Sequence, residues 1–238
     1  MSSHTPFDGD MASSGKYIYS GPHAQVSAVL ANASQSRMIH RHLLPTDRTL
    51  IDVGCGDGFY TKEFSEIESL HTVLGIDLSS PATKFAQINW GNERLNFECK
   101  SVEEMIRSGD YFDVAVVRGV LHHAEEPKLL LKSILEIAER VIVLEPNGLN
   151  PILKIIEKTS SYHLAHGERS FSPRKIKSWV NGTNSQILAM DTGVLVPFFC
   201  PSWLARILKR FEGIIESLPI FNRVVCGANV YVFGKNRN

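Results

Sequence analysis

The chain has few cysteines, no long apolar run and no surplus of either charge. Its 238 residues include four cysteines, and no two of them form a C-x-x-C pair. This argues against a disulfide scaffold or a zinc ribbon and favours a reducing compartment. No 18-residue apolar run is present, and the N-terminus lacks the apolar core of a signal peptide. We therefore expect a cytoplasmic protein without a membrane-spanning helix.

The balanced charge conceals an asymmetry along the chain. The totals are 25 basic and 25 acidic residues. Residues 151–238 hold 12 basic and 5 acidic side chains, a net charge of +7, which leaves −7 for residues 1–150. Such a split indicates two surfaces with different partners, although an uneven solvated surface would produce it too. The hydrophobic content of 43% excludes a mainly disordered chain.

Short β-branched runs alternate with longer helical stretches between residues 49 and 145. This alternation is typical of parallel βαβ units with helices on both faces of an open sheet. The expected strands are 49–53, 72–77, 97–99, 112–117, 140–145, 185–190 and 228–233. The expected helices are 25–44, 60–69, 81–90, 102–107, 127–139, 149–158, 173–179 and 202–218. The sequence predicts an α/β fold, with residues 1–45 as an N-terminal arm and cap helix.

The glycine-rich stretch LIDVGCGDGF, residues 50–59, follows the first strand. Gly54, Gly56 and Gly58 permit a tight turn and let a ligand approach the backbone. Their G-x-G-x-G spacing differs from the G-x-G-x-x-G of dinucleotide-binding proteins. Asp52 and Asp57 flank the loop and would repel a pyrophosphate. This disfavours a nicotinamide-dependent oxidoreductase and favours a ligand with an ammonium and a sulfonium, such as S-adenosylmethionine.

An acidic residue also ends the second expected strand. Asp77 lies 19 residues after Gly58, where a carboxylate can accept hydrogen bonds from both hydroxyls of a ribose. The alternative is that Asp77 merely caps the turn that follows.

The motifs LIDVGCGDG, GIDLS, FDVAVVRGVLHH and VLEPN, in this order, resemble class I S-adenosylmethionine-dependent methyltransferases, close to the ubiquinone-biosynthesis-like O-methyltransferase group. The resemblance covers about 100 residues, from about 49 to 145. It implies a Rossmann-like, doubly wound sheet of seven strands whose last two form an antiparallel hairpin. It also implies helical additions at the N-terminus and after the fifth strand, within a methyltransferase domain spanning 46–238.

The resemblance further implies which residues hold the cofactor. Asp52 and the loop of Gly54, Gly56 and Gly58 would hold the methionine part, and Asp77 with Leu78 the ribose. Arg118 would make a backbone contact near the amino-acid moiety. Ser101 replaces the acid that contacts the adenine amine in relatives, which leaves the backbone N–H of Val102 for the ring.

Methyl transfer to oxygen needs acceptor alignment and, for some acceptors, a base at the carboxyl ends of the strands. His166 is our candidate base, with Glu168 orienting it, and a solvated polar loop is the alternative. His122 and His123 follow the fourth strand, where a structural role beside the cofactor is favoured. A metal site formed by His163, His166 and Glu168 is disfavoured because a third firm ligand is lacking.

The acceptor is the least defined part of the prediction. No N-P-P-Y or D-P-P-Y follows the fourth strand, and the basic C-terminal part lacks interleaved aromatics, so no nucleic-acid partner is expected. A looser resemblance to methyltransferases of surface-polysaccharide and lipid pathways suggests a small-molecule, sugar or lipid-linked acceptor contacted by residues 149–182 and 197–222. A non-catalytic S-adenosylmethionine-binding partner or sensor is the alternative function. The oligomeric state is left open.

The expected helix 202–218 is amphipathic. Trp203, Phe211 and several Leu and Ile residues fall on one side, while Arg206, Lys209 and Arg210 fall on the other. We expect the apolar side to pack on the core or to roof the acceptor pocket. The alternative is weak peripheral contact with a membrane surface.

Overall fold

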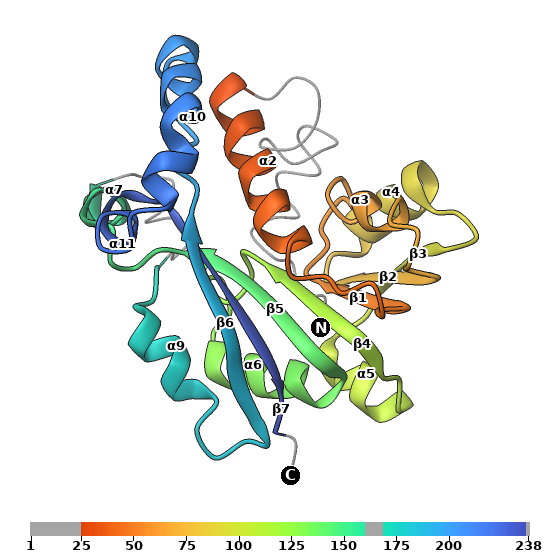
Figure 1. Ribbon diagram of the computed structural model, residues 1–238. Helices are drawn as coiled ribbons and strands as arrows, with labels where there is room; N and C mark the ends of the chain where they lie inside the picture. The colour runs from red at the N-terminus through yellow and green to blue at the C-terminus, as the bar shows by residue number, and fades with distance from the viewer. Residues whose placement is uncertain (1–24, 160–168, 237–238) are drawn as a thin grey trace.

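The computed structural model describes residues 25–159 and 169–236 and shows one twisted sheet between two layers of helices (Figure 1). The seven strands are β1 (Thr49–Val53), β2 (Thr72–Asp77), β3 (Leu95–Cys99), β4 (Phe112–Arg118), β5 (Ala138–Pro146), β6 (Ser185–Gly193) and β7 (Ala228–Lys235). Their spatial order is β3-β2-β1-β4-β5-β7-β6. β7 runs antiparallel between β5 and β6, whereas the first five strands are parallel. The expected doubly wound sheet with an antiparallel final hairpin is confirmed.

The helices connect the strands and cover both faces. Those before β4 are α2 (Val26–His40), α3 (Lys62–Ser65), α4 (Ser80–Trp90) and α5 (Val102–Ser108). Those after it are α6 (Pro127–Glu136), α7 (Pro151–Thr159), α9 (Pro173–Trp179), α10 (Ser202–Glu216) and α11 (Asn222–Val225). In Figure 1, α2, α3 and α4 lie on one side of the sheet, and α5, α6 and α9 lie on the other.

Alternate strand residues divide the interior into two apolar cores. Ile51 and Ala115 face a core that α5, α6 and α9 complete. Leu50 and Val116 face the other core, to which α2, α3 and α4 contribute. Because successive side chains of a strand point to opposite faces, a continuous apolar run fills both cores, which is why the central strands are buried on both sides.

Several expected boundaries differ from the structure. The helix expected over 60–69 shrinks to α3, because Gly58, Phe59 and Tyr60 still belong to the turn. The helix expected to reach residue 139 ends at Glu136, and β5 already begins at Ala138. The short helix α11 was not anticipated. Residues 1–24, which include the expected arm, lie outside the described part of the chain.

The largest difference concerns α10. Three of its large apolar residues do not pack on the core: Trp203, Phe211 and Ile214 are exposed. Leu204, Leu208 and Ile215 are half-buried, and the two residues that α10 buries are Ala205 and Glu212. The prediction that the apolar side covers the sheet or roofs a pocket is therefore wrong for Trp203, Phe211 and Ile214. Instead, α10 stands beside α2 and away from the sheet (Figure 1).

Candidate functional site

The glycine-rich loop joins β1 to α3 through backbone that favours glycine. Gly54, Gly56 and Gly58 have φ angles of 75°, 55° and 74°. A Cβ atom on Gly54 would lie 2.5 Å from a methyl carbon of Val120. The backbone N–H groups of Gly54 and Cys55 donate to the Ile76 carbonyl at 2.8 and 3.0 Å. The loop is thus fixed against the end of β2, with no side chain on its glycines to keep a ligand away.

Asp77 lies against this loop, as the parallel pairing of β1 and β2 requires. Val53 pairs with Ile76, so the residues that follow both strands meet at the same edge of the sheet. Asp77 Oδ2 accepts a hydrogen bond from the Gly56 N–H at 2.9 Å, and Oδ1 accepts one from the Ser79 N–H at 2.8 Å. The next residue, Leu78, is exposed beside it. The carboxylate therefore shapes the turn at the edge of the sheet where the loop lies.

Asp52 is the buried acid of the site. The Thr61 hydroxyl donates to Asp52 Oδ2 at 2.6 Å. Burial raises the pKa of Asp52 to about 6, against the opposing effects of the Thr61 hydrogen bond and of the Arg118 charge. A buried carboxyl without a direct cationic partner is poised to gain from a cationic ligand.

Arg118 connects the N-terminal helix to the loop. Its guanidinium lies 3.9 Å from the Tyr60 ring centroid. The same group donates to Asn32 Oδ1, Gln35 Oε1 and Ser36 Oγ of α2 at 3.0, 3.1 and 3.0 Å. Burial lowers the pKa of Arg118. The side chain thus anchors α2 over the carboxyl end of β4, a role that the sequence did not indicate.

Ser101 and Val102 follow β3 at the same edge of the sheet. Ser101 Oγ accepts a hydrogen bond from the Glu104 N–H at 3.2 Å, and Glu104 Oε2 accepts one from the Ser101 N–H at 2.8 Å. This reciprocal pair caps α5. Val102 is buried. The adenine contact expected of these two residues stays a prediction.

A histidine–glutamate pair lies where β4 and β5 end. His122 Nδ1 and Glu145 Oε2 are 2.9 Å apart, and both side chains are buried. Glu145 Oε1 also accepts the backbone N–H groups of Val120 and Leu121, at 3.1 and 2.8 Å. Because the Glu145 carboxylate acts as an acceptor, we assign the ring proton of neutral His122 to Nδ1. Nε2 is then the basic nitrogen of His122.

The sequence contained a signal for this pair. Arg118 pairs with Leu144 in the β4–β5 register, so Glu145 stands beside the segment that begins at Gly119. Glu145, at the end of β5, and His122, shortly after the neighbouring parallel strand β4, therefore meet at one edge of the sheet. His123 stacks on His122, with ring centroids 3.9 Å apart.

The other predicted catalytic residues, His166 and Glu168, lie outside the described part of the chain, as does His163. Within residues 25–159 and 169–236, no three His, Cys, Asp or Glu side chains cluster in a way that could hold a metal ion. No helix in these same ranges is long and apolar enough to cross a bilayer.

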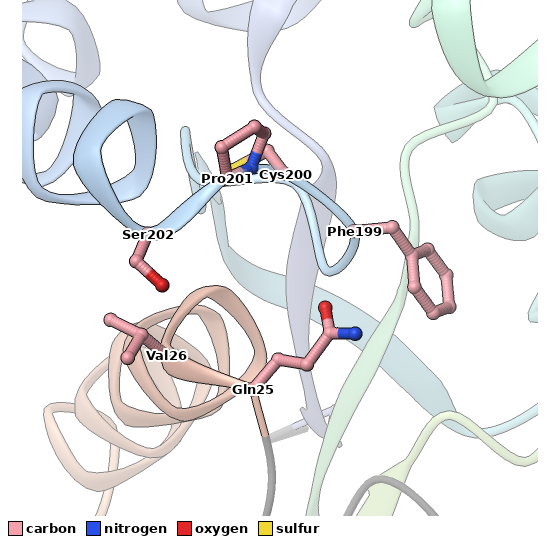
Figure 2. Close-up of a pocket in the computed structure, with 6 residues that line it drawn as sticks. All are labelled: Gln25, Val26, Phe199, Cys200, Pro201 and Ser202. Carbon is pink, nitrogen blue, oxygen red and sulfur yellow. The ribbon is translucent and has the colours of Figure 1, made fainter.

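An open surface pocket lies between the beginning of α2 and the loop before α10 (Figure 2). Its lining residues are Gln25, Val26, Phe199, Cys200, Pro201 and Ser202. None of the six is charged, and none belongs to the loop, to Asp77 or to the His122–Glu145 pair. This pocket therefore lacks the groups that would hold S-adenosylmethionine.

The part of the chain that holds this site is similar to a known protein family. Residues 51–148 match the family described as "Methyltransferase domain". This part of the chain is thus similar to a methyltransferase domain. Methyltransferases of this family use S-adenosylmethionine, which agrees with the expected cofactor. The matched range contains the loop, Asp77, Arg118 and both members of the His122–Glu145 pair.

Individual relatives agree with this assignment. The chain is 23% identical over 106 residues to a ubiquinone biosynthesis O-methyltransferase from Coxiella burnetii, a match that covers 44% of each chain. The chain thus spans less than half the length of the curated relatives that it matches. The magnesium protoporphyrin IX methyltransferase of Synechocystis PCC 6803, solved with bound SAH, superposes with a TM-score of 0.62 at 13% identity and covers 92% of this chain and 91% of its own.

A second solved structure, an S-adenosylmethionine-dependent methyltransferase from Anabaena variabilis, gives a TM-score of 0.64 at 17% identity. It covers 97% of this chain and 92% of that one. At such identities, the likeness confirms the fold of the methyltransferase domain across almost the whole chain.

Proposed function

We propose that the protein transfers a methyl group from S-adenosylmethionine to an oxygen atom of a small-molecule, sugar or lipid-linked acceptor. The observation that carries this proposal is the position of Asp77, bonded to the Gly56 N–H at the glycine-rich loop, with the buried Asp52 nearby. Two carboxylates at a loop without side chains suit an ammonium and ribose hydroxyls, and they oppose a pyrophosphate. The O-methyltransferase names of the matched relatives support oxygen as the acceptor atom.

Each residue has a part in this proposal. Asp77 would accept hydrogen bonds from the ribose hydroxyls. Asp52 would favour the cationic methionine part by its charge, and the bare backbone around Gly56 would allow close approach. When bound, S-adenosylmethionine supplies a methyl carbon already activated by the sulfonium. The protein therefore contributes mainly alignment, exclusion of water and removal of a proton.

Among the described residues, we propose His122 as the base that removes that proton. Its Nε2 would take the hydroxyl proton of the acceptor as the oxygen–carbon bond forms. Glu145, held by two backbone N–H groups, would fix the imidazole and stabilise the imidazolium. His166 with Glu168 stays the alternative base, as the sequence predicts.

Calorimetric titration with S-adenosylhomocysteine, with NADH as the comparison, tests the cofactor. We expect micromolar affinity for S-adenosylhomocysteine and none for NADH. Asp77→Ala should weaken binding about 10- to 100-fold, since a hydrogen bond to a charged group contributes about 1.5–3 kcal/mol. Asp77→Asn should lose less, because it keeps the acceptor oxygen for the Gly56 N–H. An unchanged affinity in Asp77→Ala would remove the ribose assignment.

Transfer of a labelled methyl group to fractionated cell extracts tests the reaction. With an acceptor in hand, His122→Ala should lower kcat by about 10²–10⁴-fold and leave the S-adenosylhomocysteine affinity unchanged. His166→Ala is the comparison that separates the two candidate bases. Tight cofactor binding without transfer to any fraction would favour the non-catalytic partner or sensor instead.

A further inference from the structure

The helix α10 is attached to the protein through Glu212 and Glu216, with Leu204, Leu208 and Ile215 half-buried beside them. Glu212, only 2% exposed, accepts hydrogen bonds from the Ser34 hydroxyl at 2.7 Å, from Arg37 at 2.8 Å and from Lys209 at 2.7 Å. Arg37 also pairs with Glu216 at 3.2 Å. Ser34 and Arg37 belong to α2, while the backbone N–H groups of Leu195 and Val194, just after β6, donate to Glu212 and Glu216 at 3.1 and 3.2 Å. Burial alone would raise the pKa of Glu212, but the bonds from Lys209, Arg37 and Ser34 outweigh it and hold that pKa below its usual value.

The opposite side of α10 is apolar and faces outward. At 100° per residue, Phe211 and Ile214 lie about 100–160° around the helix from Glu212. Trp203 is 64% exposed and Ile214 is 61% exposed. The exposed apolar residues of α10 are Trp203, Ile207, Phe211, Ile214 and Leu218 just beyond its end. A soluble helix normally buries such a stripe, so the orientation of α10 requires an explanation.

Two further helices extend the apolar surface. α7 buries none of its residues and exposes Ile152 and Ile155. α11 packs against α7, and Ile220, Phe221 and Val224 in and before it are exposed. Figure 1 shows α7 and α11 at the base of α10, on the side away from α2. We call the exposed apolar residues of α7, α10 and α11 the outer face.

The charges around the outer face are positive. The acids of α10 are bonded to Arg37 and Lys209, and Glu157 of α7 is paired with Lys154 at 3.0 Å. Four cations of these helices form no ion pair with any residue that the structure describes: Lys158, Arg206, Arg210 and Arg223. The outer face therefore combines an apolar surface with unpaired cations at its margin, while its acids point inward.

We propose that the outer face binds the surface of a bilayer that contains anionic phospholipid. Trp, Phe, Leu and Ile side chains would enter the boundary between headgroups and acyl chains, and the unpaired cations would meet lipid phosphates. A second copy of this chain fits less well, because a symmetric contact would bring the same cations toward one another. The proposal goes beyond methyl transfer and does not depend on it.

Flotation of the full chain with vesicles tests the proposal. Vesicles of phosphatidylcholine with 30% phosphatidylglycerol should carry the protein at low salt, whereas phosphatidylcholine alone should carry much less. High salt should weaken the binding, because it screens the cations. Equal flotation with both vesicles, or with neither, would overturn the proposal.

Paired variants test whether the outer face is the part of the protein that contacts the bilayer. Trp203→Ser with Phe211→Ser should abolish flotation, while the unfolding curve and the S-adenosylhomocysteine affinity stay unchanged. Ile88→Ser on α4 is the matched control, since Ile88 is 84% exposed but lies outside the outer face. Arg206→Gln and Arg210→Gln should each weaken binding about fivefold, and Arg107→Gln on α5 should not. Unchanged flotation of the double variant would refute the outer face as the contact.

Sedimentation velocity tests whether a second copy of this chain binds the outer face instead of a bilayer. We expect a concentration-independent species for the wild type and for the Trp203→Ser, Phe211→Ser variant. A wild-type dimer that the double variant converts to monomer would assign the outer face to a second copy and overturn the membrane proposal.

Discussion

The helices α6 and α10 have similar amphipathic patterns but are placed in opposite ways. α6 turns Leu131, Ile134 and Leu135 into the core beside β5. α10 turns Glu212 toward α2 and leaves Phe211 and Ile214 outside. An amphipathic pattern therefore fixes which side of a helix is apolar, but not whether that side meets the protein core.

The difference follows from what each helix can reach. α6 lies between two neighbouring parallel strands, so its apolar side has a sheet to cover. α10 lies in a long connection between β6 and β7, and its nearest helix, α2, offers Ser34 and Arg37. The polar residues of α2 bind the acids of α10, and Trp203, Phe211 and Ile214 stay exposed among the residues that the structure describes.

A pair of isoleucine truncations tests this comparison most strongly. Ile134 of α6 is 0% exposed and Ile214 of α10 is 61% exposed. Ile134→Ala should lower the free energy of unfolding by about 2–5 kcal/mol, through lost burial and a cavity. Ile214→Ala should change it by less than about 0.5 kcal/mol. Urea denaturation of both variants measures the difference. Equal losses would show that α10 packs its apolar side on the core.

Two of the buried carboxyls, Asp52 and Glu212, also contrast. Asp52 has a hydroxyl partner, and burial raises its pKa from 3.8 to about 6. The folded state therefore holds this proton more tightly than the unfolded state. The stability that this provides is present below about pH 4 and is lost as the pH rises through about 6. At pH 7 the ionised Asp52 is a cost that only a bound cation would offset.

Asp52→Asn should therefore stabilise the free protein at pH 7 by about 1–3 kcal/mol, because it removes the buried charge. The same variant should weaken binding of S-adenosylhomocysteine, whose ammonium loses an opposite charge. Urea denaturation and calorimetric titration of one preparation test both effects. A less stable variant that still binds normally would contradict the role of Asp52.

Glu212 should show the opposite pH dependence. Its pKa is lowered in the folded state, so its contribution to stability is present above about 4.5 and is lost as the pH falls. Glu212→Gln should cost about 1–2 kcal/mol at pH 7, since Arg37 is partly exposed and partly screened. The cost should vanish toward pH 3. Exposed Glu103 provides the matched control, and Glu103→Gln should be neutral at both pH values.

Local patterns predicted the elements with strong periodicity and missed those set by packing. β1, β2 and β4 followed from apolar runs, and the helix expected over 102–107 is α5. The extent of α3 depended on how far the glycine turn runs, which no local pattern shows. The site was anticipated as a loop with Asp77 beside it, because parallel strands end at one edge. The pairing of His122 with Glu145 was missed, because it needs the β4–β5 register.

The sequence by itself determined the sheet class, the glycine-rich loop and the acids around it, because these depend on short-range spacing and on the alternation of strands and helices. Tertiary structure decided which partner each buried polar group found. Arg118 is held by α2, and Glu212 is held by Ser34 and Arg37. Residues so far apart in sequence meet only when the chain folds, and that meeting turned the apolar side of α10 outward.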